Sequence, residues 1–224
     1  MKMKSLLTVL AVLVAGTGAW AQTFNTNLTF NVNQAIPDGD NNGLALVQTL
    51  TLGTLPGPVT DVKVSLDISG GFNGDLYAYL AGPNGGFAVL LNRTGVDGTH
   101  AFGSTDSGFA ITLDDSGSFA DIHTATAGGG VLSGTFGSDG ENLDPQSPAG
   151  DFPAAPTALL GSFNGSPASG QYVLFLSDLS AGGQATVVSW GLDITAVPEP
   201  ATTTLAAIAT IALLTLRQAR QRNS

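Results

Sequence analysis

The fold is decided by the stretch VKVSLDI, residues 62–68, in which apolar and polar side chains alternate without a break. The side chains of Val62, Val64, Leu66 and Ile68 fall on one side of an extended chain, and the residues between them fall on the other. Such alternation predicts a strand with one buried and one solvent-exposed face, which is typical of antiparallel sheets.

The same two-residue period recurs on both sides of this stretch, in segments separated by short runs rich in Gly, Asn and Asp. The other predicted strands carry Phe24, Leu28, Phe30 and Val32; Leu44, Leu46, Leu50 and Leu52; residues 76–80, 87–91, 110–113 and 172–176; and Val188, Trp190, Leu192 and Ile194. Many short strands with such punctuation favour a sandwich or a barrel, so the chain is predicted to be all-β. Residues 116–156 are predicted to form long loops with one or two short strands, within one domain over residues 22–196.

The N-terminus has the pattern of a secretory signal peptide over residues 1–21. Lys2 and Lys4 precede an apolar run over residues 6–14, and Ala19-Trp20-Ala21 then provides small residues before Gln22. A basic start, a short apolar segment and an A-x-A exit are the three parts of such a peptide. We therefore expect the mature protein to begin near Gln22 and to work outside the cell.

The C-terminal residues 197–224 carry a second targeting pattern. Val197-Pro198-Glu199-Pro200 is followed by an apolar stretch over residues 201–216 and by Arg217, Arg220 and Arg222. As a helix this stretch would be about 24 Å long. That length is marginal for a bilayer core of about 30 Å. The arginines predict a single transmembrane helix with its C-terminus in the cytoplasm and the domain outside.

Taken together, these three C-terminal features resemble the PEP-CTERM sorting signal. The resemblance implies an exosortase as partner, transient anchoring in the inner membrane of a Gram-negative bacterium, and export to the cell envelope, the outer surface or the extracellular matrix. It also implies an association with exopolysaccharide and biofilm. A plain single-pass anchor remains the alternative.

The composition of the domain between the two targeting segments, here called the body, limits the kinds of partner that it can bind. The chain has 17 acidic and 7 basic residues and no cysteine. Outside the two targeting segments only Lys63 and Arg93 are basic, so the body has a net charge of −14. Such a surface repels nucleic acid and anionic lipid and attracts divalent cations. Without cysteine, disulfides and thiol catalysis are excluded.

The order of several short motifs over residues 34–195 resembles the P domain (Homo B domain) that follows the catalytic domain of subtilisin-like proprotein convertases. The motifs are Ile36-Pro37-Asp38, Gly74-Asp75-Leu76, Gly82-Pro83-Asn84-Gly85, Gly170-Gln171-Tyr172 and Ser189-Trp190-Gly191-Leu192. The resemblance implies a jelly-roll β-sandwich that assists a protease and often binds calcium. The chain departs from the family by having Tyr172 where Trp is frequent, an expanded Gly-rich middle, and no protease domain.

Closely spaced acids suggest a calcium site. Residues 38–43 read Asp-Gly-Asp-Asn-Asn-Gly, the opening of a calcium loop. An EF-hand is excluded because Thr49 occupies the position of the bidentate acid and no helices flank the loop. Asp38 and Asp40, with Asp75 and Asp178 at strand ends, are the predicted metal ligands. The alternative, which also applies to Asp114 and Asp115, is that these carboxylates cap turns.

No catalytic set is apparent, so the chain is predicted to be no enzyme. The two histidines, His100 and His123, lie in irregular segments without a nucleophile pattern, and we assign neither a role. Trp190 and Tyr172 lie on alternating strands, and Trp190 follows the buried parity of its strand, so it is expected in the core. Tyr77 and Tyr79 have the opposite parity to Leu76 and Leu80, so they are candidates for exposed, sugar-stacking rings.

These observations favour a non-enzymatic surface or extracellular-matrix protein stabilised by calcium. The alternatives are a carbohydrate-binding jelly roll and an accessory partner of a separate exported subtilisin-like protease. The ligand, the oligomeric state and the removal of the tail are left open by the sequence.

Overall fold

The computed structural model describes residues 23–52, 57–197, 217–218 and 221 of the chain. Residues Thr23–Val197 form one compact unit, which carries all nine strands found in these ranges. Because this unit has a core of its own, we expect it to fold when expressed alone.

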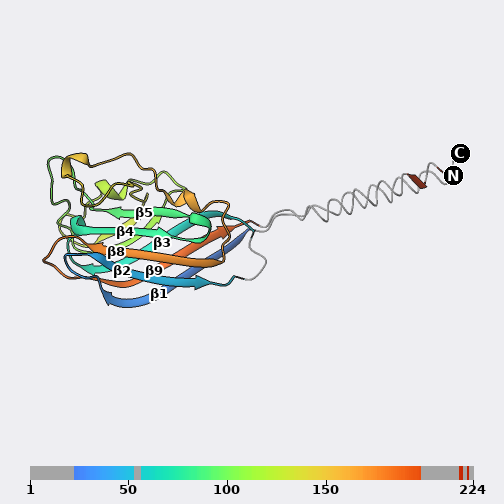
Figure 1. The fold of residues 1–224 in the computed structure, drawn as a ribbon, viewed down its shortest axis with the longest axis horizontal. Coiled ribbons are helices and arrows are strands. Elements are labelled where there is room, and N and C mark those ends of the chain that lie inside the picture. Colours follow the sequence, from blue (N-terminus) through green and yellow to red (C-terminus); the bar gives the residue numbers. More distant parts are fainter. Residues whose placement is uncertain (1–22, 53–56, 198–216, 219–220, 222–224) are drawn as a thin grey trace. The chain divides into compact units, whose positions relative to one another are not determined.

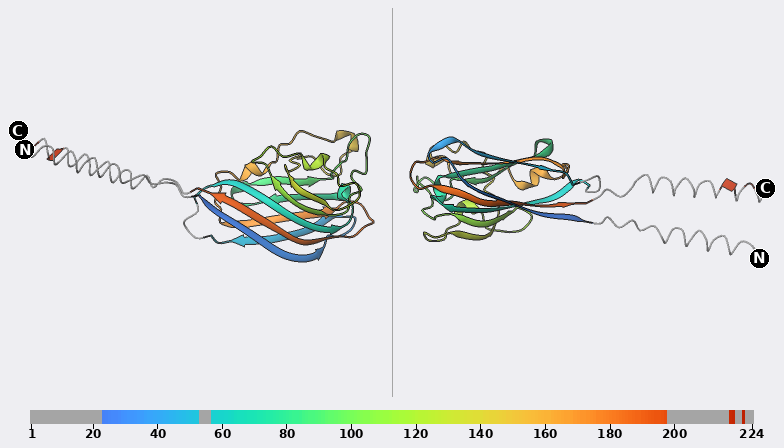
Figure 2. Two further views of the ribbon diagram at one scale, coloured as in Figure 1. Left: turned by 180° about the vertical axis from the view of Figure 1, so that it is seen from behind. Right: turned by 90° about the horizontal axis from the view of Figure 1, so that it is seen from below.

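The strands form two sheets that pack face to face as a β-sandwich (Figures 1 and 2). The five-stranded sheet has the order β1 (Phe24–Ala35), β9 (Ala185–Ala196), β3 (Val59–Gly70), β6 (Phe109–Asp114) and β7 (Leu132–Phe136). The four-stranded sheet has the order β2 (Asp40–Leu50), β8 (Gly170–Asp178), β4 (Leu76–Ala81) and β5 (Phe87–Asn92). The predicted all-β fold and the sandwich are thus confirmed.

One pair of strands departs from the predicted antiparallel arrangement. Strand β7 pairs with β6 in parallel, with Phe109 opposite Leu132 and Leu113 opposite Phe136. A parallel neighbour requires a long crossover connection, and residues 115–131 provide one. The rest of the predicted loop region, residues 116–156, contains only short 3-10 turns besides β7.

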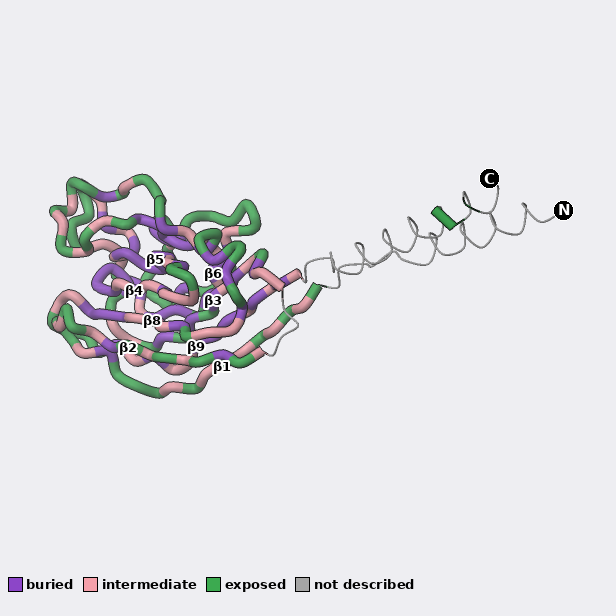
Figure 3. Tube along the Cα trace, turned by 45° about the vertical axis from the view of Figure 1, so that its right-hand side comes forward, coloured by how far each residue is buried: buried purple, intermediate pink, exposed green. Residues whose placement is uncertain are grey.

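The core lies between the sheets and follows the predicted parity. Val62, Val64, Leu66 and Ile68 are each at most 1% exposed, Trp190 is buried as predicted, and Tyr172 is buried as well. Figure 3 shows buried residues along the strands and exposed residues along much of the loops. Phe30 of the edge strand β1 covers Trp190, with ring centroids 4.9 Å apart.

The prediction for Val188 was wrong. Val187 is buried and Val188 is only half-buried. The register of β9 against β3 shifts between the pairs Asp67–Ser189 and Ile68–Val187, so Val188 is an extra residue. Such a bulge reverses the parity of the residues before it, which alternation alone does not reveal.

Candidate functional site

The four predicted metal ligands lie at one end of the four-stranded sheet. Asp178 ends β8, with its Cα opposite Leu76 of β4 on one side and Asp40 of β2 on the other. Asp75, which directly precedes β4, is 8% exposed, and Asp178 is 1% exposed. Strand pairing therefore brings together residues that are far apart in the sequence.

The surroundings of Asp75 and Asp178 disfavour their charged forms. Burial, followed by the charges of Asp75 and Asp38, raises the pKa of Asp178 to about 6. Burial also raises the pKa of Asp75, although Ser180 and the charge of Arg93 act in the opposite direction. Within residues 57–197 neither carboxylate forms an ion pair.

The other two predicted ligands are exposed or half-buried and are engaged by nearby groups. One carboxylate oxygen of Asp40 accepts hydrogen bonds from the backbone and side-chain nitrogens of Asn42, at 2.9 and 2.8 Å. The carboxylate of Asp38 accepts from the backbone N–H of Gly182 at 2.9 and 3.1 Å. Both contacts are those of turn-capping acids, and Asp38 remains close enough to act on the pKa of Asp75 and Asp178.

Asp114 and Asp115 connect loops to the five-stranded sheet. Asp114 binds Lys63 Nζ at 2.7 Å and accepts from Ser116. Asp115 accepts from the backbone N–H groups of Ser138 and Leu160 and from the Ser138 hydroxyl. The contact of Asp114 with Ser116 is that of a turn-capping acid, whereas Asp115 joins segments that are distant in the sequence.

The outer faces of the two sheets differ in character. On the five-stranded sheet, β3 carries Asp61, Lys63 and Asp67, and β9 carries Asp193. On the four-stranded sheet, no strand contains a charged residue except at its end, where Asp40 begins β2 and Asp178 ends β8. A sheet face in water is ordinarily polar, so a charge-free outer face indicates an interaction surface.

This surface, which we call the aromatic face, is centred on four rings. Strand pairing places β4, β5, β8 and β2 side by side, and their outward residues include Tyr77, Tyr79, Phe87, Phe175, Val173, Ala45 and Val47. The four rings are half-buried, and Val47 is 51% exposed. Tyr77 and Tyr79 therefore have the partial exposure that their parity predicted.

Tyr79 is the central ring of the aromatic face. It stacks on Phe175 of β8, with centroids 4.9 Å apart and planes 17° apart, and its centroid lies 5.3 Å from that of Phe87. Since β4 lies between β8 and β5, these two rings lie on opposite sides of Tyr79. Tyr77 contacts Tyr79 at 6.0 Å and Phe175 at 6.5 Å.

Two features border the aromatic face. Gly43 of β2, with a φ of +57°, leaves room for Phe175, because a Cβ there would come within 2.7 Å of the Phe175 ring. On the other side, the backbone N–H groups of Asp139 and Gly140 bond to Leu90 and Val89 of β5. Burial, and then the charges of Tyr79, Asp139 and Asp144, raise the pKa of Tyr77 to about 12, so acidic residues lie near this end of the face.

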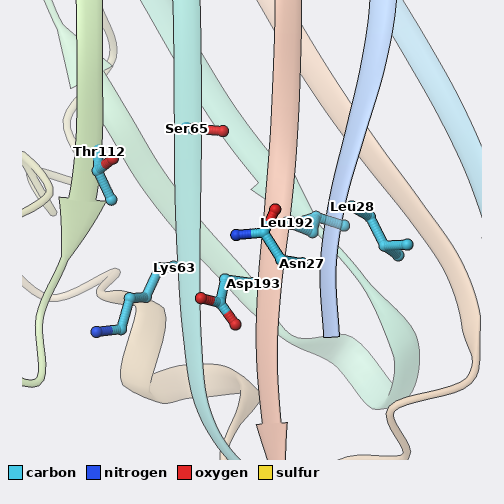
Figure 4. A pocket seen from close by; sticks show the side chains of 7 residues that line it. All are labelled: Asn27, Leu28, Lys63, Ser65, Thr112, Leu192 and Asp193. Carbon is cyan, nitrogen blue, oxygen red and sulfur yellow. The ribbon is translucent and has the colours of Figure 1, made fainter. Parts of the chain in front are cut away.

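The outer face of the five-stranded sheet has one shallow hollow, with a volume of about 170 Å³. Figure 4 shows its lining residues on four adjacent strands; they are Asn27, Leu28, Lys63, Ser65, Thr112, Leu192 and Asp193. Because the charge of Lys63 is already taken up by Asp114 and Asp61, at 2.7 and 3.9 Å, the hollow offers little to an anionic ligand.

The two histidines occupy very different places. His100 is exposed and pairs with Asp97, whereas His123 is 2% exposed and lies 3.0 Å from Asp139. In the described part of the chain neither ring hydrogen-bonds to a serine hydroxyl. Sequence reasoning missed the contacts of His123, because its partners Asp139 and Glu141 are 16 and 18 positions away, at a spacing that matches no motif.

The predicted targeting segments lie almost wholly outside the described residues. The signal peptide, the apolar stretch over residues 201–216, and Pro198, Glu199, Pro200, Arg220 and Arg222 are not described. Val197 follows β9, and Arg217 is exposed in a helical segment. Among the described residues no helix has the length and apolar character needed to cross a membrane.

No protein-family model matches the sequence, and no curated protein is significantly similar to it. Among solved structures, the chain is similar to a serine protease of Aeromonas sobria, with 15% identity and a TM-score of 0.42. It is also similar to the crystal structure of that protease in complex with the chaperone ORF2, with 16% identity and a TM-score of 0.44. These matches cover 83% and 84% of this chain but 29% of the other chain in each case. Similarity at this level carries no argument about function.

Proposed function

We propose that this chain is a non-enzymatic binding module of the bacterial surface or extracellular matrix, and that its aromatic face docks onto a protein. The observation that carries the proposal is the charge-free outer face of the four-stranded sheet, with Tyr79 at its centre. The cores of protein interfaces are depleted in charge and enriched in Tyr and Phe, as this face is.

The packing of the rings favours a protein over a sugar. Phe175 stacks on one face of Tyr79 and Phe87 lies beside the ring, tilted by 42°, so little of the central ring is open for stacking on a pyranose. The remaining surface consists of ring edges and the aliphatic side chains of Val47, Val173 and Ala45. Such a surface suits apolar side chains of a partner better than hydroxyl-rich rings.

The charge of the body then indicates which kind of protein the partner is. Two copies of a body with a net charge of −14 repel each other, which disfavours self-association through this face. Asp144 is exposed near the Tyr77 end of the face and the body is strongly acidic, so the complementary partner has an apolar patch rimmed by Lys and Arg. The resemblance to P domains names the first candidate, a separate subtilisin-like protease exported by the same cell.

The location of the module is also a proposal. The signal peptide over residues 1–21 would export the body, and the PEP-CTERM-like residues 197–224 would be handled by an exosortase. A body without cysteine and with a substantial hydrophobic core is compatible with folding outside the cell.

Calcium binding at the acidic end of the sheet is part of the proposal. Asp38, Asp75 and Asp178 are electrostatic neighbours, and a cation would offset the repulsion between these carboxylates, of which Asp75 and Asp178 are buried without an ion-pair partner in the described part of the chain. Asp40 would contribute its Oδ2, because both contacts with Asn42 use Oδ1. Calcium accepts irregular oxygen shells, which suits ligands drawn from three loops.

A carbohydrate remains the second candidate. The exposed aromatic rings gather in one patch, which is the arrangement that a glycan-binding jelly roll requires. The ligand would be a neutral segment of the exopolysaccharide, since the acidic body repels anionic chains.

A matched pair of valine substitutions tests the docking surface. Val47 on the aromatic face and Val131 in the loop before β7 are 51% and 54% exposed. We expect Val47→Asp to weaken binding of residues 22–197 to the purified exported protease at least tenfold, because it places a charge in an apolar interface. Val131→Asp is expected to leave the affinity unchanged. Isothermal titration calorimetry measures both dissociation constants, and circular dichroism checks folding.

Three outcomes would contradict the proposal. They are equal affinities for the two variants, binding of the exopolysaccharide but not the protease, and a wild-type dimer that Val47→Asp dissociates. The second outcome would establish the carbohydrate candidate, and the third would assign the face to a second copy of the chain.

A further inference from the structure

A second polar centre lies beneath the loops that border β5. It consists of His123 in the 3-10 turn Ile122–Thr124, Asp139, and Glu141, which are 2%, 0% and 1% exposed. One ligand atom from each lies within 4.8 Å of the others, and no other such group occurs among the described residues. Nδ1 of His123 is 3.0 Å from Asp139 Oδ2 and 3.9 Å from Glu141 Oε1.

The hydrogen bonds of His123 require a cation at Nδ1. Its Nε2 is 2.9 Å from the carbonyl oxygen of Val96, which can only accept, so Nε2 carries a hydrogen. In the neutral ring Nδ1 would then present a lone pair to a carboxylate oxygen at 3.0 Å, which is repulsive. Either a proton or a metal ion must therefore lie between them.

If only a proton lay between His123 and Asp139, the negative charge of the centre would not be fully neutralised. One imidazolium would still face two carboxylates, while Lys63 and Arg93, the basic residues of the described body, are bound elsewhere. The two buried carboxylates would then share one positive charge.

Unpartnered oxygens around the centre are a separate sign of a missing ligand. Glu141 Oε2 is buried without a hydrogen-bond partner, and so is Asn92 Oδ1. Asn92 belongs to the same cluster, because its backbone N–H donates to Asp139 Oδ2 and its side-chain nitrogen donates to the Glu141 carbonyl. Buried acceptors without a donor are destabilising unless a cation or a water satisfies them.

We propose that His123, Asp139 and Glu141, together with the amide oxygen of Asn92, hold a divalent first-row transition-metal ion, with Zn²⁺ as the best fit. One imidazole nitrogen and carboxylate oxygens form a donor set that suits zinc better than calcium. Ligand atoms of a tetrahedral zinc site lie about 3.3 Å apart, and the observed separations of 3.0 and 3.9 Å bracket that value. Because the ligands are buried, the ion is structural and not catalytic.

The ion would link three segments of the chain through its ligands. Asn92 ends β5, His123 belongs to the loop between β6 and β7, and Asp139 and Glu141 follow β7. Phe152, from a fourth segment, stacks on the His123 ring with centroids 6.1 Å apart and planes 4° apart. Asn92 lies opposite Tyr77, so the ion would order one border of the aromatic face, although its binding does not depend on the proposed function.

Metal titration of residues 22–197, freed of metal with EDTA, tests the site. Zn²⁺ at 100 times its dissociation constant is expected to raise the thermal midpoint by about 5–10 °C, whereas Ca²⁺ acts through a different site. Glu141→Gln keeps the side-chain shape, and we expect it to weaken Zn²⁺ at least tenfold. His123→Asn serves as a second variant, and His100→Asn, in the exposed His100–Asp97 pair, is the matched control. Co²⁺ as a probe should give the visible absorption of a tetrahedral site in the wild type and not in Glu141→Gln.

Each result decides the proposal. One Zn²⁺ per chain, with affinity lost in Glu141→Gln and kept in His100→Asn, supports the site. The absence of 1:1 binding by the wild type, an equal affinity in Glu141→Gln, or loss of the zinc effect in His100→Asn overturns it. The cluster would then be an ion-paired triad. No partner protein enters the experiment, so its failure is separate from a failure of the docking proposal.

Discussion

Replacing Tyr79 by alanine is expected to weaken binding of the protein partner at least thirtyfold, the largest loss from any single residue of the aromatic face. Tyr79 contacts Phe175, Phe87 and Tyr77, so its removal both deletes the central contact and loosens the neighbouring rings. Central aromatic residues of interfaces cost about 2 kcal/mol or more on truncation, which corresponds to about thirtyfold in the dissociation constant. Surface plasmon resonance against the purified protease measures the change.

Two controls make the Tyr79 result specific. Tyr79→Phe retains the ring and is expected to bind within about threefold of the wild type, because the hydroxyl adds only about 0.5 kcal/mol. Phe102→Ala removes a ring that is 81% exposed and lies outside the aromatic face, so its affinity should be unchanged. Wild-type affinity in Tyr79→Ala, or an equal loss in Phe102→Ala, would show that the partner binds elsewhere.

Replacing Asp178 by asparagine is expected to have opposite effects in EDTA and in calcium. The pKa of Asp178 is raised to about 6 in the folded state, whereas an unfolded aspartate has a pKa of about 3.9. The folded state therefore binds this proton more tightly. In EDTA the carboxyl group of Asp178 does not change the free energy of unfolding below about pH 4. As the pH rises to about 6 its ionisation destabilises the folded state, and this loss reaches about 3 kcal/mol above that pH.

Asp178→Asn removes that charge, so at pH 7.5 in EDTA the variant should be more stable than the wild type by about 1–3 kcal/mol. In excess calcium the order should reverse, because the variant lacks the carboxylate that would bind the ion. Urea unfolding in EDTA and in calcium, repeated at pH 4, measures the free energies. At pH 4 in EDTA the difference between wild type and variant should largely disappear.

Asp67→Asn, which alters an exposed carboxylate of β3, is the matched control and should change neither free energy by more than about 0.5 kcal/mol. A calcium response that survives in Asp178→Asn would remove Asp178 from the calcium site. A variant that is less stable than the wild type in EDTA would show that the carboxylate is already compensated.

The zinc and calcium proposals can be tested separately by measuring the response of two variants to each ion. Glu141→Gln should lose the response to zinc and keep the response to calcium, and Asp178→Asn should do the reverse. Glu141 lies in the loop after β7 and Asp178 ends β8, and the two residues share no hydrogen bond or ion pair given by the structure. Independent sites of this kind are expected to have nearly additive effects on stability.

Much of the fold followed from local patterns in the sequence. Alternation over residues 62–68 and in the other segments predicted the strands and their buried faces, because side-chain direction in a strand depends only on the residue's parity. The same parity predicted a buried Trp190 and a partly exposed Tyr79. The acidic composition, the lack of cysteine and the two targeting patterns are likewise properties of the chain itself.

Only the tertiary structure decided which strands share a sheet, and with that which side chains meet. Pairing of β4 with β8 places Asp75 beside Asp178, and pairing of β8 with β2 and β4 assembles the aromatic face. The path of a loop brings His123 to Asp139 and Glu141, and a bulge exchanges Val187 for Val188. Contacts between distant residues depend on the closure of long loops and on packing across the whole core, and no local period in the sequence records either.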